Sequence, residues 1–158
     1  MQGIYKGKKY RVAKISTFYR VISGEKEEGF EEYIDILGEK RPDIFVKDVD
    51  IHELDYLYEV KYEFLYRGHY FKALSTMIRE LIDKDYFEIA AGIEKYDLIE
   101  KLGFKRLDES TWWKDIRRKD IEAIKIIEEP EGIFKEQGLK IKILEGKAID
   151  DFLASVKD

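Results

Sequence analysis

The sequence predicts an α+β protein in which two tandem β-β-β-α-β repeats form a largely antiparallel sheet, closed by a C-terminal hairpin and helix. Three observations lead to this class. Blocks of similar sequence recur in the same order, which indicates an internal duplication. Apolar residues alternate along several short runs, as expected of half-buried strands. Other runs have helical spacing and end at a glycine, as amphipathic helices often do.

The duplication consists of three pairs of blocks, offset by about 61, 65 and 67 positions. The matched blocks are residues 4–12 with 65–73, 37–43 with 102–108, and 45–49 with 112–116. We therefore expect repeats at about 3–61 and 62–127, followed by a closing segment at 128–158. A chain of 158 residues, of which 44% are hydrophobic, suits a single compact domain over 1–158.

Each repeat begins with a tight hairpin. Gly7 and Gly68 occupy the turns, where glycine readily adopts the positive φ that a two-residue turn needs. In the first repeat, alternating apolar residues then predict strands at 9–15 and 18–23. A valine would resist the turn conformation, so both glycines are expected to stabilise the fold.

The middle of the first repeat has a helical period. Apolar residues at 30, 33, 34 and 37 alternate with acids, so we expect an amphipathic helix that ends at Gly38. A strand is expected at 44–49. A short helix is expected at 50–57, with Asp50 as its N-cap and Glu53 completing a capping box.

The second repeat follows the same order, with one ambiguous region. Its expected elements are strands at 86–91 and 111–116, a helix at 93–102 that ends at Gly103, and a short helix at 120–124. Residues 75–82 have helical spacing where the first copy has a strand and a turn. We expect strands there, joined by a longer and partly helical loop, and the sequence leaves the secondary structure of 75–85 open.

The closing segment begins as a third, truncated copy. Residues 138–143 repeat the glycine and the alternation that follows it, and residues 148–156 are expected to form a helix. A trailing strand of this kind commonly seals the open edge of a repeated sheet.

The composition favours a soluble, cytoplasmic protein without a membrane partner. The chain has no cysteine, so disulfides and thiolate chemistry are excluded. Its N-terminus lacks the apolar core of a signal peptide. No run of about 18 apolar residues is present that would cross a membrane.

The common catalytic patterns are missing, so we expect a non-catalytic protein with no cofactor and no metal. His52 and His69 do not have the spacing that places two imidazoles on one metal ion. The eleven glycines are scattered and form no phosphate-binding loop, and no serine lies in a nucleophile elbow. Both histidines are expected to be exposed polar residues.

A nucleic-acid interface is one alternative. The first hairpin interleaves basic residues with aromatic ones, as single-strand binders do; these are Lys6, Lys8, Lys9 and Arg11 with Tyr5 and Tyr10. The net charge of −5 weighs against this reading, because nucleic-acid-binding domains are usually basic. If the hairpin does not bind nucleic acid, its basic residues simply form a solvated outer face over an aromatic inner face.

A protein interface is the other candidate, and two groups of residues predict it. Acidic residues gather just before the expected helix and in its first turn, namely Glu25, Glu27, Glu28, Glu31 and Glu32. An acidic surface steers a protein onto a basic partner, although the same residues also suit a solvated helix end. Phe45 and Trp112 occupy equivalent positions in the two copies and are candidates for partner binding, because aromatics dominate interface hot spots.

The repeated Tyr-Lys/Arg-Gly hairpin, the Leu-Gly and Trp-Lys-Asp-Ile blocks, and the stretch Asp-Ile-His-Glu-Leu-Asp resemble small bacterial immunity proteins. Such proteins are encoded beside polymorphic or contact-dependent toxins. The resemblance implies a non-catalytic protein that binds and neutralises a cognate toxin domain, often a nuclease. A nucleic-acid-binding module and a small-molecule enzyme stay open as alternatives, as do the identity of the toxin and the oligomeric state.

Overall fold

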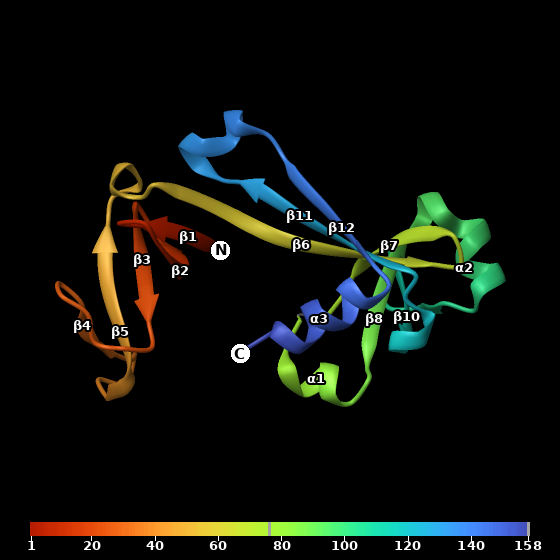
Figure 1. The fold of residues 1–158 in the computed structure, drawn as a ribbon, viewed down its shortest axis with the longest axis horizontal. Helices are drawn as coiled ribbons and strands as arrows, with labels where there is room; N and C mark the ends of the chain where they lie inside the picture. The colour runs from red at the N-terminus through yellow and green to blue at the C-terminus, as the bar shows by residue number, and fades with distance from the viewer. Residues whose placement is uncertain (76, 158) are drawn as a thin grey trace. The chain divides into compact units, whose positions relative to one another are not determined.

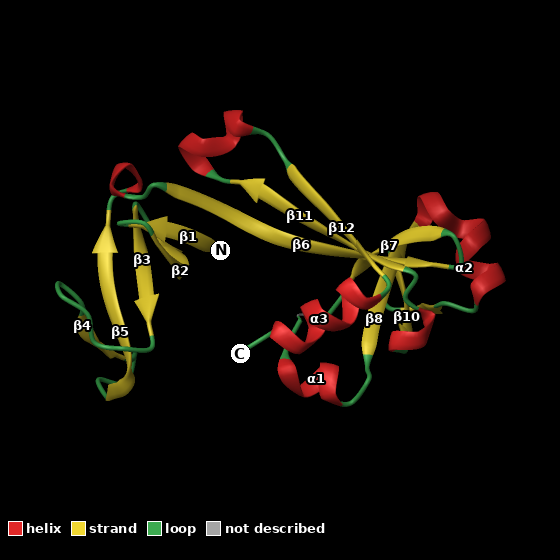
Figure 2. Ribbon diagram, viewed as in Figure 1, coloured by secondary structure: helices red, strands yellow, loops and turns green. Residues whose placement is uncertain are grey.

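The computed structural model describes residues 1–75 and 77–157. It consists mostly of antiparallel strands, with a few short helices and a C-terminal helix (Figure 1, Figure 2). The predicted α+β class is therefore confirmed. None of the helices in the described part of the chain is long and apolar enough to span a membrane.

The chain divides into two units. The first unit comprises residues 1–60 and 128–140, and the second comprises residues 61–127 and 141–158. Their boundary lies one residue from the expected end of the first repeat at 61. The single compact domain stays a prediction.

The first unit is a six-stranded antiparallel sheet in the order β4-β5-β3-β2-β1-β6. Its elements are β1 (Gln2–Tyr5), β2 (Lys8–Ile15), β3 (Phe18–Ser23), β4 (Glu31–Ile34), β5 (Lys40–Val49), the 3₁₀ turn η1 (Ile51–Glu53) and the first part of β6 (Tyr56–Tyr66). The turn from β1 to β2 uses Lys6 at φ 48° and Gly7 at φ 76°, which confirms the predicted hairpin.

The second unit has the order β6-β7-β8-β10-β9, and β11 pairs with both β6 and β12. Its elements begin with β7 (His69–Ala73), α1 (Arg79–Asp83), β8 (Phe87–Gly92), η2 (Ile93–Lys95), α2 (Tyr96–Leu102), β9 (Lys105–Arg106), β10 (Thr111–Ile116) and η3 (Arg118–Asp120). The closing segments are β11 (Ala123–Pro130), which continues into the first unit, η4 (Gly132–Gln137), which belongs to the first unit, and β12 (Lys140–Glu145) and α3 (Lys147–Ser155). They confirm the closing hairpin and helix.

Strand pairing follows the same order in the two predicted repeats. Val12 pairs with Val21 between β2 and β3, and Ala73 pairs with Ile89 between β7 and β8. Val12 and Ala73 are 61 positions apart, and Val21 and Ile89 are 68 positions apart. These offsets match β2 with β7 and β3 with β8. The strand that follows each 3₁₀ turn then returns beside the first strand of its copy.

One hydrogen-bond pattern at the start of each copy repeats as well. The Asp55 amide donates to the Ile4 carbonyl, and the Asp55 carboxylate accepts from the Gly7 amide at 3.0 Å. In the second copy, the Glu122 amide donates to the Leu65 carbonyl, and its carboxylate accepts from the Gly68 amide at 3.1 Å. The two hairpin turns are therefore held by equivalent acidic side chains.

The helix predicted at 30–37 is wrong, since this segment contains β4, paired antiparallel with β5. Of its apolar residues, Phe30 is buried, whereas Ile34 and Leu37 are exposed. Pairing with β5 therefore overrides the helical period. In the second copy the equivalent segment is helical, and α2 ends at Gly103 with φ 75°, as predicted.

Three further expectations need correction. The short helix at 50–57 is only the 3₁₀ turn η1, although its capping box of Asp50 and Glu53 is confirmed. The short helix at 120–124 is instead η3, which ends at Asp120 before β11 begins. The described residues of 75–82 contain the start of α1 and no strand, while Thr76 lies outside the described residues.

Each unit has its own apolar core. The core of the first unit contains Val12, Val21, Val49 and Leu57, together with Tyr5 and Phe30. The second is larger and includes Phe64, Phe71, Phe87 and Ile89. Ile149 and Leu153 of α3 are buried in it, so the C-terminal helix covers one face of the second unit's sheet.

Candidate functional site

The segment from Gly24 to Asp43 is the strongest candidate for a binding surface. It contains the loop after β3, β4, a tight turn and the start of β5, and we refer to residues 24–43 as the acidic hairpin. The chain has 34 acidic and 29 basic residues. Eight of the acidic residues and three of the basic residues lie in the acidic hairpin. The remaining 26 of each sign balance, so the acidic hairpin accounts for the whole net charge of −5.

Asp35 organises the tip of the acidic hairpin. Its Oδ1 accepts hydrogen bonds from the Leu37 and Glu39 amides, both at 2.9 Å, and its Oδ2 accepts one from Arg41 Nε at 3.2 Å. The Glu39 amide is the largest of the interactions that lower the pKa of Asp35. Gly38 completes the turn at φ 82°. The tip is therefore a closed, internally bonded loop.

This loop presents apolar side chains to solvent. Ile36 is 97% exposed and Leu37 is 81% exposed, more than any other large hydrophobic residue among those that the structure describes. Ile34 beside them is 56% exposed. Turn positions of this kind are usually polar, so the fold itself gives no reason for two apolar residues there. An exposed apolar patch with a polar rim is typical of an interaction site.

Acidic residues flank the exposed tip. Glu31 and Glu32 lie on β4, an edge strand, opposite Val46 and Phe45 of β5. Both glutamates are exposed, and Glu32 lies 4.0 Å from Lys40. The surface thus combines an apolar tip with a negative rim.

The other predicted site residues have different places. Glu25 and Glu28 are exposed in the loop before β4. Phe45 is half-buried in β5 and packs against the first unit's core. Trp112 belongs to the second unit, where it contacts Tyr96 edge-on at 6.4 Å and lies under the guanidinium of Arg106. Phe45 and Trp112 are therefore partly engaged in packing within separate units.

Glu27 is held within the fold by three side chains. It accepts hydrogen bonds from Lys8 Nζ at 2.9 Å, Tyr10 Oη at 2.8 Å and Ser23 Oγ at 2.7 Å. These bonds, with that from Lys8 the largest, lower the pKa of Glu27 to about 2. Its carboxylate therefore joins the loop to β2 and β3.

Ile36 and Leu37 were missed as candidates by the sequence. The sequence feature that could have identified them is a pair of adjacent apolar residues directly before Gly38, a turn-forming glycine. The helical spacing of Leu37 with Phe30 assigned this position to a buried helix face instead. A turn held by Asp35 reverses that inference, because it points the side chains outward.

Two basic residues of the first hairpin, Lys6 and Lys8, make contacts inside the first unit. Lys8 binds Glu27, and this hydrogen bond raises the pKa of Lys8. Lys6 lies 5.5 Å from the centre of the Tyr5 ring. Tyr5 and Tyr10 in turn pack against Phe30. The aromatic rings that would stack on bases are therefore committed to packing.

The two histidines belong to no metal-binding cluster in the part of the chain that the structure describes. Within residues 1–75 and 77–157, no group of three or more histidine, aspartate or glutamate side chains is placed to hold a metal ion. His52 is exposed in η1, and His69 is exposed at the first position of β7, opposite Tyr66.

The fold and the acidic hairpin define a duplicated α+β protein with an exposed apolar tip set in a negatively charged surface. The chain belongs to the family described as Uncharacterised conserved protein UCP033725, whose model matches residues 1–132. No curated protein and no solved structure matches it. The matched range includes both repeats and the acidic hairpin.

Proposed function

We propose that this protein is a non-catalytic bacterial immunity protein that acts in the cytoplasm, where it binds a cognate toxin domain through the acidic hairpin and neutralises it. The observation that carries the proposal is the hydrogen-bonded tip, which leaves Ile36 and Leu37 97% and 81% exposed. The resemblance of the sequence to immunity proteins supplies the type of partner.

The apolar tip provides the anchor. Burial of two aliphatic side chains stabilises a complex by about 1.5–3 kcal/mol for each fully buried side chain. Since Asp35 already holds the turn closed, little conformational entropy is lost when the tip enters a pocket on the partner. Ile36 and Leu37 therefore have the properties of an interface hot spot.

The negative rim determines the charge of the partner. Glu31 and Glu32 are exposed on an edge strand, and the acidic hairpin as a whole has a net charge of −5. Complementary charge accelerates association and disfavours partners of the same sign. A toxin domain with a basic surface, such as a nuclease, fits this rim.

The proposal is tested first by the gene neighbourhood and by co-expression. An adjacent gene is expected to encode a large protein with a C-terminal toxin domain. Expression of that domain alone should stop growth, and co-expression with this protein should restore it. If no neighbour encodes such a domain, or if co-expression fails to protect, the immunity function is wrong.

A charge-reversed variant tests the role of the rim. Replacement of Glu31 and Glu32 by lysine should lower the association rate with the toxin domain by at least about tenfold at low salt. The matched control reverses Glu100 and Glu109, two exposed acids of the second unit, and should leave the rate near that of the wild type. Equal rates for both variants would contradict binding through the acidic hairpin.

A further inference from the structure

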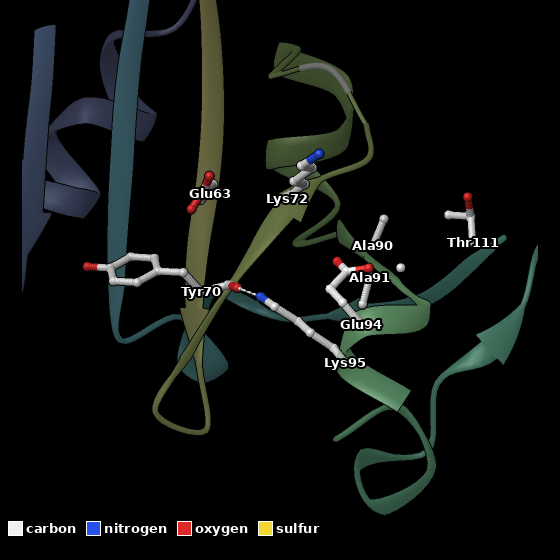
Figure 3. Close-up of a pocket in the computed structure, with 9 residues that line it drawn as sticks. Glu63, Tyr70, Lys72, Ala90, Ala91, Glu94, Lys95 and Thr111 are labelled. Atoms are coloured by element: carbon white, nitrogen blue, oxygen red, sulfur yellow. Dashed lines mark hydrogen bonds between the residues drawn. The ribbon is translucent and has the colours of Figure 1, made fainter. Parts of the chain in front are cut away.

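A second candidate site lies in the second unit and is independent of the acidic hairpin. It is a hollow of about 320 Å³ on the sheet, lined by residues of β6, β7, β8, η2 and β10 (Figure 3). Ala90 and Gly92 form its floor, because β8 turns Phe87, Ile89 and Ala91 toward the core and its alternate positions away from it. The floor therefore carries almost no side chain.

The first unit has a larger residue at the position equivalent to Ala90. Ala90 pairs with Lys72 on one side and with Trp113 on the other. The equivalent residue in the first unit is Ile22, which pairs with Arg11 and Val46. The second copy thus has a small residue where the first has a large one, and this difference helps to open the hollow.

Four charged side chains surround the floor. Two of them have partners: Glu63 lies 3.7 Å from Lys125, and Lys95 donates a hydrogen bond to the Tyr70 carbonyl (Figure 3). Lys72 and Glu94 form no ion pair with any residue that the structure describes. The hollow therefore offers one unpaired ammonium and one unpaired carboxylate.

Gly92 lets the Glu94 carboxylate lie against the sheet. A Cβ at this position would overlap the carboxylate oxygens of Glu94. The backbone of Gly92 is extended, with φ −94°, so its conformation does not require glycine. Glycine at this position therefore leaves room for the Glu94 carboxylate.

We propose that this hollow binds a small zwitterion, with the chemistry of a free α-amino acid. Lys72 receives the carboxylate of the ligand and Glu94 receives its ammonium group, through charge-assisted hydrogen bonds. The four charged lining residues sum to zero, which suits a ligand without net charge and disfavours a polyphosphate. The volume lies at the lower end of the range for ligand pockets and matches a ligand of this size.

The test is a titration of the full chain with each standard amino acid, followed by amide NMR shifts. At least one amino acid should give saturable shifts that centre on residues 88–95 and 111–113, with a millimolar or lower dissociation constant. Its N-acetylated and decarboxylated forms should each bind at least about tenfold more weakly, because each lacks one of the two charges. Absence of saturable shifts for every amino acid, or equal binding of the blocked forms, overturns the proposal.

Two variants locate the ligand. Gly92→Ala should preserve the fold, since only the flexible end of Glu94 has to move, yet it should weaken binding by about tenfold or more. Lys72→Gln should do the same. Gly24→Ala and Arg11→Gln are the matched controls at the equivalent positions of the first unit, and Gly24 has open space around its Cβ position. Binding that responds equally to variants and controls overturns the assignment of the site.

Discussion

Glu27 illustrates how much the role of a single residue depends on tertiary contacts. The sequence places it in an acidic cluster and predicts a partner-binding role. In the structure its carboxylate accepts hydrogen bonds from Lys8, Tyr10 and Ser23. The other acidic residues of this loop, Glu25 and Glu28, are exposed. Charge clustering along a sequence therefore identifies an acidic region but does not distinguish its surface residues from its structural ones.

The lowered pKa of Glu27 predicts a specific response to acid. Folding lowers this pKa to about 2, so the ionised carboxylate stabilises the fold above the pKa of an unfolded glutamate, about 4.3. This stabilisation is lost as the pH falls from about 4.3 toward 2. The Glu27→Gln variant should therefore unfold more readily than the wild type at pH 7 and lose less stability on acidification. Urea denaturation at pH 7 and pH 3 measures the difference.

Glu31→Gln is the control for this prediction, because the Glu31 side chain is exposed and has no hydrogen-bonded partner among the described residues. It should follow the wild-type pH dependence. An acid response of Glu27→Gln that matches the wild type would show that its three hydrogen bonds do not stabilise the fold.

The elements that the sequence predicts well are those that local geometry determines. The turn at Gly7, the C-cap at Gly103 and the capping box at Asp50 depend on residues a few positions apart, and all three are present. The segment 30–37 is different, because its conformation depends on pairing with β5 and on the turn at Asp35. Its apolar spacing suits a helix, yet the helix would leave the edge of β5 unpaired.

The two hairpin glycines give a direct test at this scale. Gly7→Val and Gly68→Val should each destabilise the protein by about 1–3 kcal/mol, because valine resists positive φ. The φ angles are 76° and 78°, and open space surrounds both Cβ positions, so the cost comes from the backbone and not from a clash. Chemical denaturation measures it.

Gly24→Val is the matched control, since Gly24 has open space and no positive φ. It should change the free energy of unfolding far less than either hairpin variant. Equal destabilisation by all three substitutions would show that the positive φ of the turns is not the cause.

At the scale of the whole molecule, the two copies share a scaffold and differ in two segments. The second copy has α1 between its second and third strands, where the first copy has a short turn. The segment after the third strand of each copy is a β-hairpin in the first unit and the η2–α2 helical segment in the second. The acidic hairpin is the first of these insertions, and Glu94 and Lys95 of the hollow belong to the second. The sequence predicts the shared scaffold from its repeated blocks, whereas a repeat cannot predict the parts in which the copies diverge.

The proposed partner-binding surface lies within residues 24–43. The charge of the chain outside residues 24–43 is balanced, and its most exposed apolar side chains lie at the tip of that same segment. Charge and apolar exposure thus coincide in one insertion, while the duplicated strands provide support.

The most direct measurement is the dissociation constant of the complex with the toxin domain of the neighbouring gene, determined by calorimetry. Replacement of Ile36 and Leu37 by serine should weaken binding by about 30-fold or more, as expected for the loss of a hot spot of about 2 kcal/mol or greater. The control replaces Ile93 and Leu107, which are 62% and 51% exposed in the second unit, and should leave the dissociation constant unchanged. A double variant at the tip that binds as tightly as the wild type would contradict the account.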